Sequence, residues 1–333
     1  MSIPRRSGDC HSTVRHATFR MDPITHTLAG AAMARVGGDR RTPLAAATLM
    51  LAANAPDIDI YTVWTETSFG SIAFRRGWTH GPYALVLLPF IITMAVLAWD
   101  ALLRRRRNPT APAANANWIF ALSVIGVLSH PALDWLNTYG VRFLMPFNPT
   151  WFHGDAVFII DPYWWLLLGT TVFLASRKAA LRTVRIAGAM ALAYPLLLRS
   201  LSWQGKRLAR EVAAEQGIPQ TNVLYQPLPA NPFGAQLILR TDAAYHFGSV
   251  RWLPRPEVRL DGEVIARGDW SDPRVIQAKL DPDVRDYLVW SSYPWVQINT
   301  TAADGSATVV FGDARFPRGG IAGGLGGLTV SVR

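Results

Sequence analysis

Residues 82–103 form the longest apolar run in the chain, with Asp100 as their one charged side chain and four arginines directly after them. As a helix these 22 residues would extend about 33 Å, enough to cross the ~30 Å hydrocarbon core of a bilayer. Residues 118–137 form a second run of this kind. Because a bilayer offers no water to satisfy backbone polar groups, such runs restrict this part of the chain to membrane helices.

Four further apolar segments are shorter. Residues 163–176 open with a pair of tryptophans that suits the aromatic belt at a membrane interface, and residues 186–198 follow them. Segments 27–36 and 43–55 are each short for a span of about 20 residues, so they form either a shallow hairpin or spans extended by their polar ends. We therefore expect a polytopic α-helical membrane protein with about four to six membrane helices.

The chain changes character after Gly205. Residues 206–216 have the pattern of an amphipathic helix, and the remainder is rich in Gly and Pro between short alternating runs. These runs predict strands at residues 223–225, 236–241, 257–260, 287–290, 296–300, 308–311 and 328–332. Asp261-Gly262 and Asp304-Gly305 are predicted hairpin turns. The sequence thus predicts a C-terminal β-rich domain.

Three regions follow from these patterns. Residues 1–20 are basic and polar, without the apolar core of a signal peptide, and Met21 begins a more natural start. We interpret them as a basic N-terminal extension or a misassigned start. Residues 21–204 form the helical membrane domain that carries the polar motifs, and residues 205–333 form the β-rich domain.

The charged residues and the cysteine content narrow the function. Cys10 is the only cysteine, which excludes an intrachain disulfide and a cysteine-based zinc cluster, so a metal site must use His and carboxylates. The net charge of +10 comes partly from short Arg and Lys clusters between the apolar runs, at 104–107 and 177–185. The positive-inside rule for membrane proteins explains such clusters better than a DNA-binding surface does, so we do not expect a nucleic-acid partner.

Alternation of the apolar runs places the polar motifs together. If the arginine clusters are cytoplasmic, the segments around His26, Asp57, His80, His130 and His153 all fall at the opposite end of the helices. The C-terminal domain falls on that side as well. We therefore expect the motif face and the β-rich domain to be periplasmic, although Arg75, Arg76 and the basic N-terminal arm oppose this orientation.

The richest motif is the segment 129–140 at the end of the second apolar run. On a helix, His130, Asp134 and Asn137 are three or four positions apart and share one face, and Pro131 predicts a kink or a restart. His and Asp are costly in an apolar segment unless they have partners or a metal ion. The structural alternative is a tilted, capped helix end with a satisfied polar cluster.

A divalent-metal site is the simplest physical account of the converging imidazoles and carboxylates, with zinc as first choice and manganese or iron as alternatives. The predicted ligands are His26, Asp57, Asp59, His80, His130 and Asp134. Asp57, Asp59 and Asp134 are also the predicted catalytic carboxylates, on one ion or on two. The predicted supporting or substrate-binding residues are Asn54, Arg76, Asn137, His153 and Asp155. Each also has a structural explanation, such as the use of Asp after Pro as a turn or cap residue.

Four motifs carry a resemblance, in order: residues 21–30, 54–59, 76–80, and 129–140 followed by Pro146-Phe147. Through them, roughly from Met21 to Asp161, the chain resembles the YdjM-like family of inner-membrane proteins, which are described as metal-dependent hydrolases and as LexA-binding. The resemblance implies a multi-pass protein of the bacterial inner membrane. Two departures stand out, since Arg75 replaces a His and Gly81 replaces a Ser in the family's usual His-Arg-Gly-x-Thr-His-Ser.

Two classes of function remain at this point. The first is a metal-dependent hydrolase that acts at the bilayer surface on a phosphoester or a lipid-linked substrate. The alternative is a membrane regulatory or scaffold protein of the LexA-binding type, with a structural metal or none, although our topology leaves only short basic loops for a cytoplasmic LexA contact. A transporter is a third hypothesis, disfavoured because the polar groups cluster at helix ends and not at the midplane.

Overall fold

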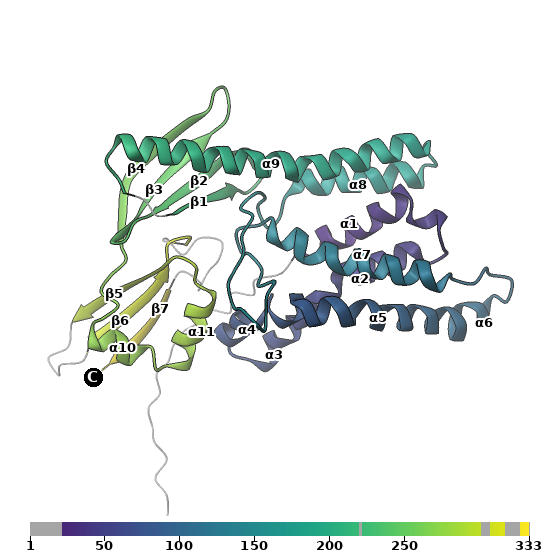
Figure 1. Cartoon of the computed structure of the whole chain (residues 1–333), viewed down its shortest axis with the longest axis horizontal. Coiled ribbons are helices and arrows are strands. Elements are labelled where there is room, and N and C mark those ends of the chain that lie inside the picture. Colours follow the sequence, from purple (N-terminus) through teal and green to yellow (C-terminus); the bar gives the residue numbers. More distant parts are fainter. Residues whose placement is uncertain (1–21, 220–221, 301–306, 317–326, 333) are drawn as a thin grey trace, which may run out of the picture. The chain divides into compact units, whose positions relative to one another are not determined.

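The structure, a computed structural model, describes residues 22–219, 222–300, 307–316 and 327–332. The chain divides into two compact units at Gly268. The first unit contains a set of helices and a four-stranded sheet, and the second contains a three-stranded sheet with two short helices (Figure 1).

The helical elements of the first unit are, in chain order, α1 (Pro23–Val36), η1 (Gly38–Arg40), α2 (Ala45–Asn54), η2 (Ala55–Tyr61), α3 (Thr62–Thr65), α4 (Ser68–Phe74), η3 (Trp78–His80), α5 (Pro82–Trp99), η4 (Asp100–Arg104), α6 (Arg105–Arg107), α7 (Ala116–Trp135), α8 (Pro162–Ser176) and α9 (Leu181–Glu215). Caps set several of these starts. Asp22, directly before Pro23, accepts from the backbone N–H groups of Ile24 and Thr25 in α1, and Asn115 accepts from the backbone N–H of Trp118 in α7.

Three helical stretches are long and apolar enough to cross a membrane: Pro82–Arg107, which joins α5 to α6, Ala116–Trp135 and Leu181–Glu215. Helices α1, α2 and α8 contain 14, 10 and 15 residues, fewer than the roughly 20 that a spanning helix needs. The predicted four to six membrane helices therefore exceed what the described residues support. Helix α7 also continues past Pro131 to Trp135, so the predicted restart there is wrong.

Small residues bring α2 into close contact with both α1 and α7. A Cβ atom added at Gly30 of α1 would lie 2.7 Å from the carbonyl oxygen of Leu49, and one at Gly126 of α7 would lie 2.5 Å from the Cβ of Ala52. Helix backbones approach this closely only where side chains are minimal. Helix α5 packs against α7, and α8 packs against α1 and α9.

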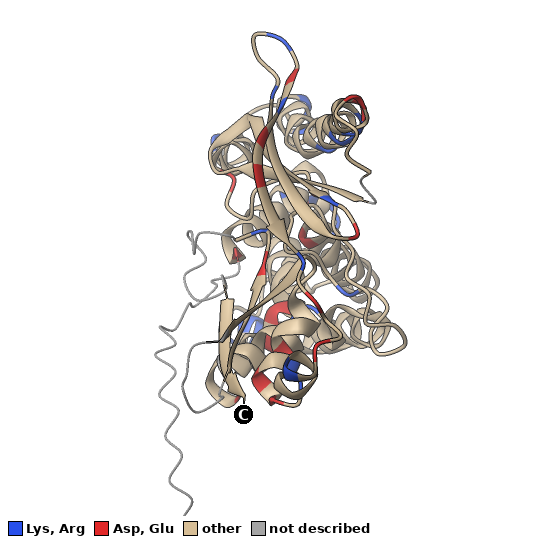
Figure 2. Ribbon diagram, turned by 90° about the vertical axis from the view of Figure 1, so that its left-hand side faces the viewer, with Lys and Arg blue, Asp and Glu red and all other residues tan. Residues whose placement is uncertain are grey.

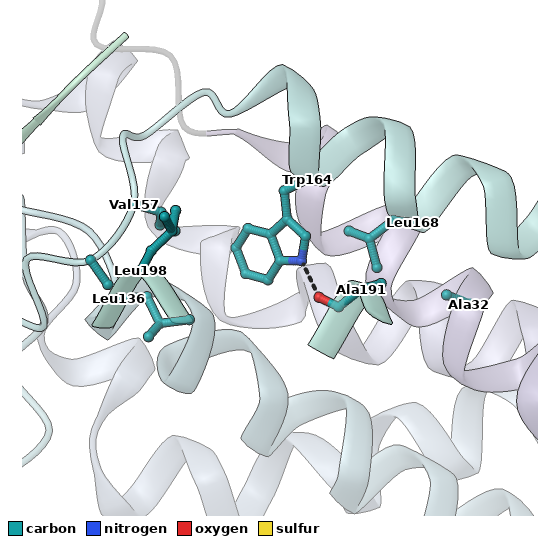
Figure 3. Close-up of a cluster of buried hydrophobic side chains, with 9 residues drawn as sticks. Ala32, Leu136, Val157, Trp164, Leu168, Ala191 and Leu198 are labelled. Carbon is teal, nitrogen blue, oxygen red and sulfur yellow. Dashed lines mark hydrogen bonds between the residues drawn. The ribbon is translucent and has the colours of Figure 1, made fainter. Parts of the chain in front are cut away.

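Helix α9 contains Pro195, which cannot donate a backbone hydrogen bond to the carbonyl of Ala191. The indole Nε1 of Trp164 in α8 takes its place and donates to that carbonyl at 2.9 Å (Figure 3). Trp164 is buried, and Leu168 and Leu198 belong to the same apolar cluster. The predicted interface position is therefore wrong for Trp164, because its ring fills the α8–α9 contact and its N–H satisfies a carbonyl that proline leaves unpaired.

Helix α9 runs without interruption through Gly205, where the sequence suggests a change of domain. Gly205 is a packing site, since a Cβ there would lie 2.8 Å from Cε2 of Tyr225 in the sheet. Ala209 and Ala213 are buried in the same cluster as sheet residues. The end of α9 that faces the viewer in Figure 2 carries both basic and acidic residues. One helix thus serves as a candidate span and as the support of the first sheet.

The first sheet is antiparallel, in the order β1-β2-β3-β4. Its strands are β1 (Asn222–Leu228), β2 (Asn231–Arg240), β3 (Ala244–Arg251) and β4 (Glu257–Ala266). The sequence did not predict β3. Asp261-Gly262 is not a hairpin turn: it lies within β4, where pairing shifts from Gly248↔Leu260 to His246↔Val264. The positive φ of Gly262, 74°, accommodates this irregularity.

The second unit contains α10 (Pro273–Ala278), α11 (Pro282–Trp290) and an antiparallel sheet of β5 (Pro294–Thr300), β6 (Ala307–Asp313) and β7 (Gly327–Val332). The strand predicted at residues 287–290 is wrong, because these residues form the last turn of α11. Asp281 caps that helix ahead of Pro282, a strong helix start. The predicted turn at Asp304-Gly305 lies outside the described residues.

A buried ion pair organises the second unit. Asp313 Oδ1 accepts from Nε of Arg315 at 2.9 Å, and its Oδ2 accepts from the Ser291 hydroxyl at 2.6 Å and from Arg315 Nη2 at 2.9 Å. Burial by itself would raise the pKa of Asp313, but the guanidinium and these hydrogen bonds hold that pKa below its ordinary value. The carboxylate is therefore fully partnered and needs no further ligand.

The close α2–α7 contact at Gly126 can be tested by substitution. We expect Gly126→Ala to lower the free energy of unfolding by about 1–3 kcal/mol, because the added methyl group must displace Ala52. The measurement is thermal unfolding in detergent. Gly169→Ala in α8 is the matched control, since a Cβ there lies within 4 Å of no atom of the described residues. Equal behaviour of the two variants would contradict the proposed close α2–α7 contact.

Candidate metal centre

Three parts of the first unit supply the polar side chains of this centre. Asp57 lies in η2, directly after α2, and His80 ends η3. His130 and Asp134 lie one turn apart on α7, near the helix end. Their ligand atoms all lie within 4.8 Å of one another.

The distances between these atoms are short and similar. Nε2 of His130 lies 3.1 Å from Nε2 of His80 and 3.2 Å from Oδ1 of Asp57. Oδ2 of Asp134 lies 3.3 Å from Nε2 of His80 and 3.5 Å from Nε2 of His130. The remaining measured separation, from His80 Nε2 to Asp57 Oδ1, is 3.9 Å. A tetrahedral zinc site with bonds of ~2.0 Å has ligand atoms ~3.3 Å apart.

Neighbouring groups turn the Nε2 atom of each imidazole inward as an acceptor. Nδ1 of His130 lies 2.6 Å from the carbonyl oxygen of Ala53, to which it donates. The Thr79 hydroxyl donates to Asp59 at 2.7 Å and lies 2.9 Å from Nδ1 of His80, so its oxygen accepts from that nitrogen. With both protons on Nδ1, the two Nε2 atoms present lone pairs to each other, an arrangement that a cation stabilises.

The carboxylates show the same inward orientation. Oδ1 of Asp57 and Oδ2 of Asp134 are buried and have no hydrogen-bond partner within the described parts of the chain. Both oxygens therefore face the imidazoles as anionic acceptors, a donor set that suits a divalent cation.

Oδ1 of Asp134, the carboxylate oxygen outside the cluster, is held by Arg76 and His26. Oδ1 accepts from Nη2 of Arg76 at 2.9 Å and lies 3.4 Å from Nε2 of His26. The His26 ring stacks on His130 with centroids 3.9 Å apart. Arg76 adopts a positive φ of 54°, and its guanidinium lies over the ring of Tyr139. Arg76 and His26 thus brace Asp134 and His130.

The other predicted residues have separate roles. Asp59 is fully buried, lies 3.6 Å from Nδ1 of His80 and accepts from the backbone N–H of Arg76. Asn137 accepts from Arg76 and from the backbone of Tyr139 and Gly140. Asp59 and Asn137 therefore orient the residues that line the site.

The structure places Asn54, His153 and Asp155 among different partners. Asn54 donates to the Thr27 hydroxyl and to the carbonyl of Met50 in α2. The Asp155 carboxylate pairs with Lys206 of α9 at 2.6 Å, and His153 Nδ1 lies 3.1 Å from the carbonyl of Thr138. These contacts stabilise the fold around the centre.

Sequence reasoning did not single out two groups that support the ligands. One is the carbonyl of Ala53, which no side-chain pattern can reveal. The other is Thr79, whose hydroxyl connects Asp59 to His80. The pairing of a hydroxyl residue with the following His was the available signal, but a helix cap explains that pair equally well.

An open groove of about 750 Å³ reaches the centre at Asp57. Its lining is mostly aliphatic, from Leu51 of α2 and from Leu88, Ile91 and Val96 of α5, and Asn54 and Asp57 add polar groups. Asp57 has 12% of its side chain exposed, whereas His80 and His130 have none. Asp57 is therefore where a molecule in the groove meets the cluster.

One comparison with known proteins is informative. The YdjM inner membrane protein family matches residues 21–206, more than half of the chain. The chain belongs to this family. No curated protein and no solved structure matches it. The four clustered residues and their supports all lie within the stretch that the YdjM family covers.

The two departures from the YdjM motif occupy packed positions. Arg75 is buried, and its carbonyl accepts from Nη2 of Arg142 at 3.0 Å. A Cβ at Gly81 would lie 2.1 Å from the carbonyl oxygen of Met145. This chain therefore requires glycine at position 81, because a serine there would displace the backbone at Met145.

Removal of one imidazole tests the centre. We expect purified wild-type protein to retain about one equivalent of zinc, manganese or iron, and His80→Ala to lose it, because half of the nitrogen ligands disappear. Metal content of the detergent-purified protein is the measurement. His246→Ala in β3 serves as the control and should retain the metal. Undiminished metal in His80→Ala would show that the cluster is only a structural polar network.

Proposed function

We propose that this YdjM-family protein is a membrane-bound metal-dependent hydrolase that acts at the bilayer surface on a lipid-linked phosphoester. One observation supports this most: two imidazole Nε2 atoms and two carboxylate oxygens that accept no hydrogen bond from the described residues converge at an apolar groove. A polar network with a purely structural role would pair those oxygens, as Asp313 does in the second unit.

The residues of the centre would have different roles in the proposed reaction. A divalent ion held by Asp57, His80, His130 and Asp134 would polarise a phosphoryl oxygen and activate water near neutral pH. Asp57 is the partly exposed member of the cluster, so with Oδ1 toward the ion its second carboxylate oxygen would accept a proton from the attacking water. Arg76 holds Asp134 by its outer oxygen, and Asp59 fixes the tautomer of His80 through Thr79.

The groove supports a lipid-linked substrate. Its aliphatic wall on α5 belongs to a stretch that is long and apolar enough to cross a membrane, and Ile91 and Leu87 of that helix are more than half exposed. A hydrocarbon chain lying along this wall would bring its polar head to Asp57. Binding energy from the chain would then position the scissile bond.

Asp57→Asn tests the proposed chemistry. With zinc- or manganese-loaded protein in mixed micelles, we expect wild type to hydrolyse a fluorescent acyl-chain phosphate monoester. We expect Asp57→Asn to lower kcat about 10²–10⁴-fold, the usual contribution of a proton acceptor. Asp39→Asn is the control, because Asp39 is exposed and pairs with Arg35 beyond the other end of α1.

A second variant in the same experiment tests the role of the groove. Ile91→Trp should raise KM for the acyl-chain substrate and leave hydrolysis of p-nitrophenyl phosphate unchanged, because the added ring fills the groove and not the cluster. No hydrolysis of either compound by metal-loaded wild type would contradict the proposed function.

We also propose that the metal centre faces the periplasm of a bacterial inner membrane. The Arg and Lys clusters follow α5 and α8, at the helix ends away from the centre. In the sequence Arg75 and Arg76 oppose this orientation, but in the structure both are buried and Arg76 pairs with Asp134. They therefore do not count as loop charges in the positive-inside rule.

A reporter joined after residue 333 tests this orientation in cells. We expect alkaline phosphatase activity from the fusion, because α9 begins within the Arg and Lys cluster at 177–185, would cross the membrane away from it, and is followed by no candidate membrane helix in the described residues. A GFP fusion at the same position should be dark. Bright GFP with inactive phosphatase would reverse the assignment.

A further inference from the structure

A second cavity lies at the opposite end of α1 and α7 from the metal centre. It has a volume of about 590 Å³ and is lined by the end of α1, η1, α2, the start of α7 and the start of α9. The lining includes Met33, Arg40, Arg41, Trp118, Ile125 and Arg185. His26 and Met33 are seven residues apart on α1, so a rise of 1.5 Å per residue separates the two places by about 10 Å or more along the helix.

Three arginines from two separate segments line this cavity. Arg40 and Arg41 come from η1 and the residue after it, and Arg185 comes from the first turns of α9. Within the described residues, no carboxylate pairs with any of the three. The nearby Arg35 differs, because Asp39 neutralises it at 2.6 Å. The cavity therefore carries a concentrated positive charge that suits an anion with several oxygens.

Neighbouring groups hold two of these arginines in place. The guanidinium of Arg41 lies over the Trp118 ring, 4.6 Å from its centroid, and Nε of Arg185 donates to the carbonyl of Val36 at 3.2 Å. Both contacts leave the terminal nitrogens available to a ligand. Trp118 lies near the start of a candidate membrane helix, a position where tryptophan marks the headgroup level.

The rest of the cavity is apolar. Met33, Leu49 and Leu122 line it, and Ile125 of α7 has 47% of its surface exposed. A free inorganic anion would make no use of these side chains, whereas an amphiphile would place its chain on them and its headgroup among the arginines. Basic cavities between membrane helices are a known setting for anionic lipid headgroups.

We propose that this cavity binds an anionic glycerophospholipid, with its phosphate among Arg40, Arg41 and Arg185 and an acyl chain along Met33, Leu122 and Ile125. The site is separate from the metal centre and does not depend on the proposed hydrolase activity. Its occupant would join η1, α7 and α9, three segments that are far apart in the sequence.

Native mass spectrometry of the full-length, delipidated protein in detergent tests the proposal. We expect added phosphatidylglycerol to bind at least about 10-fold more tightly than phosphatidylcholine. The triple variant Arg40→Gln, Arg41→Gln, Arg185→Gln should remove this preference. The matched control is Arg106→Gln, Arg107→Gln, Arg182→Gln, which loses the same charge from the same end of the helices and should keep the preference.

A second variant distinguishes loss of the lipid site from loss of the fold. Ile125→Trp keeps all three arginines and fills the apolar part, so we expect it to weaken phosphatidylglycerol binding with an unchanged thermal unfolding midpoint. Equal losses in both triple variants would overturn the proposal in favour of diffuse attraction. Full competition by inorganic phosphate would overturn it in favour of a simple anion site, and so would equal binding of the two lipids.

Discussion

The close approach of α2 to α1 and α7 is the contact on which the rest of the first unit depends. Gly30 and Gly126 allow it, and Ala52 and Ala53 keep the facing surface of α2 small. This approach lets the Ala53 carbonyl accept from Nδ1 of His130. Since η2 follows α2 without a break, the same helix also delivers Asp57 to Nε2 of His130. One helix–helix contact therefore sets both the tautomer of an imidazole and the position of a carboxylate.

Two buried polar clusters in this chain differ in a way that bears on function. Taking a charged or polar group out of water is costly unless it finds partners. Around Asp313 each carboxylate oxygen accepts hydrogen bonds, and Arg315 supplies the opposite charge. Around Asp134 only the outer oxygen is satisfied, by Arg76, while the inner oxygen faces two imidazoles without a donor. The first arrangement is complete as protein, and the second leaves room for a cation.

Periodicity and spacing predicted the helices better than they predicted the roles of individual residues. The spacing of His130 and Asp134 indicated a shared helix face, and the structure adds Asp57 and His80 to the same cluster. The sequence could not predict that Asp59 supports the cluster from outside it. Its hydrogen-bond partners, Arg76 and Thr79, lie 17 and 20 positions later in the chain. A pattern of residue types reports burial, but it does not report which buried groups face one another.

The sheet region shows the same limit. The sequence changes character after Gly205, yet the Tyr225 ring packs against this glycine and α9 continues through it. Strand β3 was missed because Gly248 weakens its alternating pattern, although it lies at the centre of the ladder between β2 and β4. In both cases the deciding partner comes from a distant part of the chain, and no local window contains it.

The length of α9 has a mechanical consequence. Its 35 residues extend about 52 Å, and a span across a bilayer core would use about 30 Å of that. The remainder carries the first sheet, fixed by Gly205, Ala209 and Ala213. A tilt of about 10°, well within the range by which membrane helices adapt to bilayer thickness, would displace the far end of such a rod by about 9 Å. The sheet would therefore swing as the membrane thins or thickens, which makes α9 a lever between bilayer thickness and sheet position.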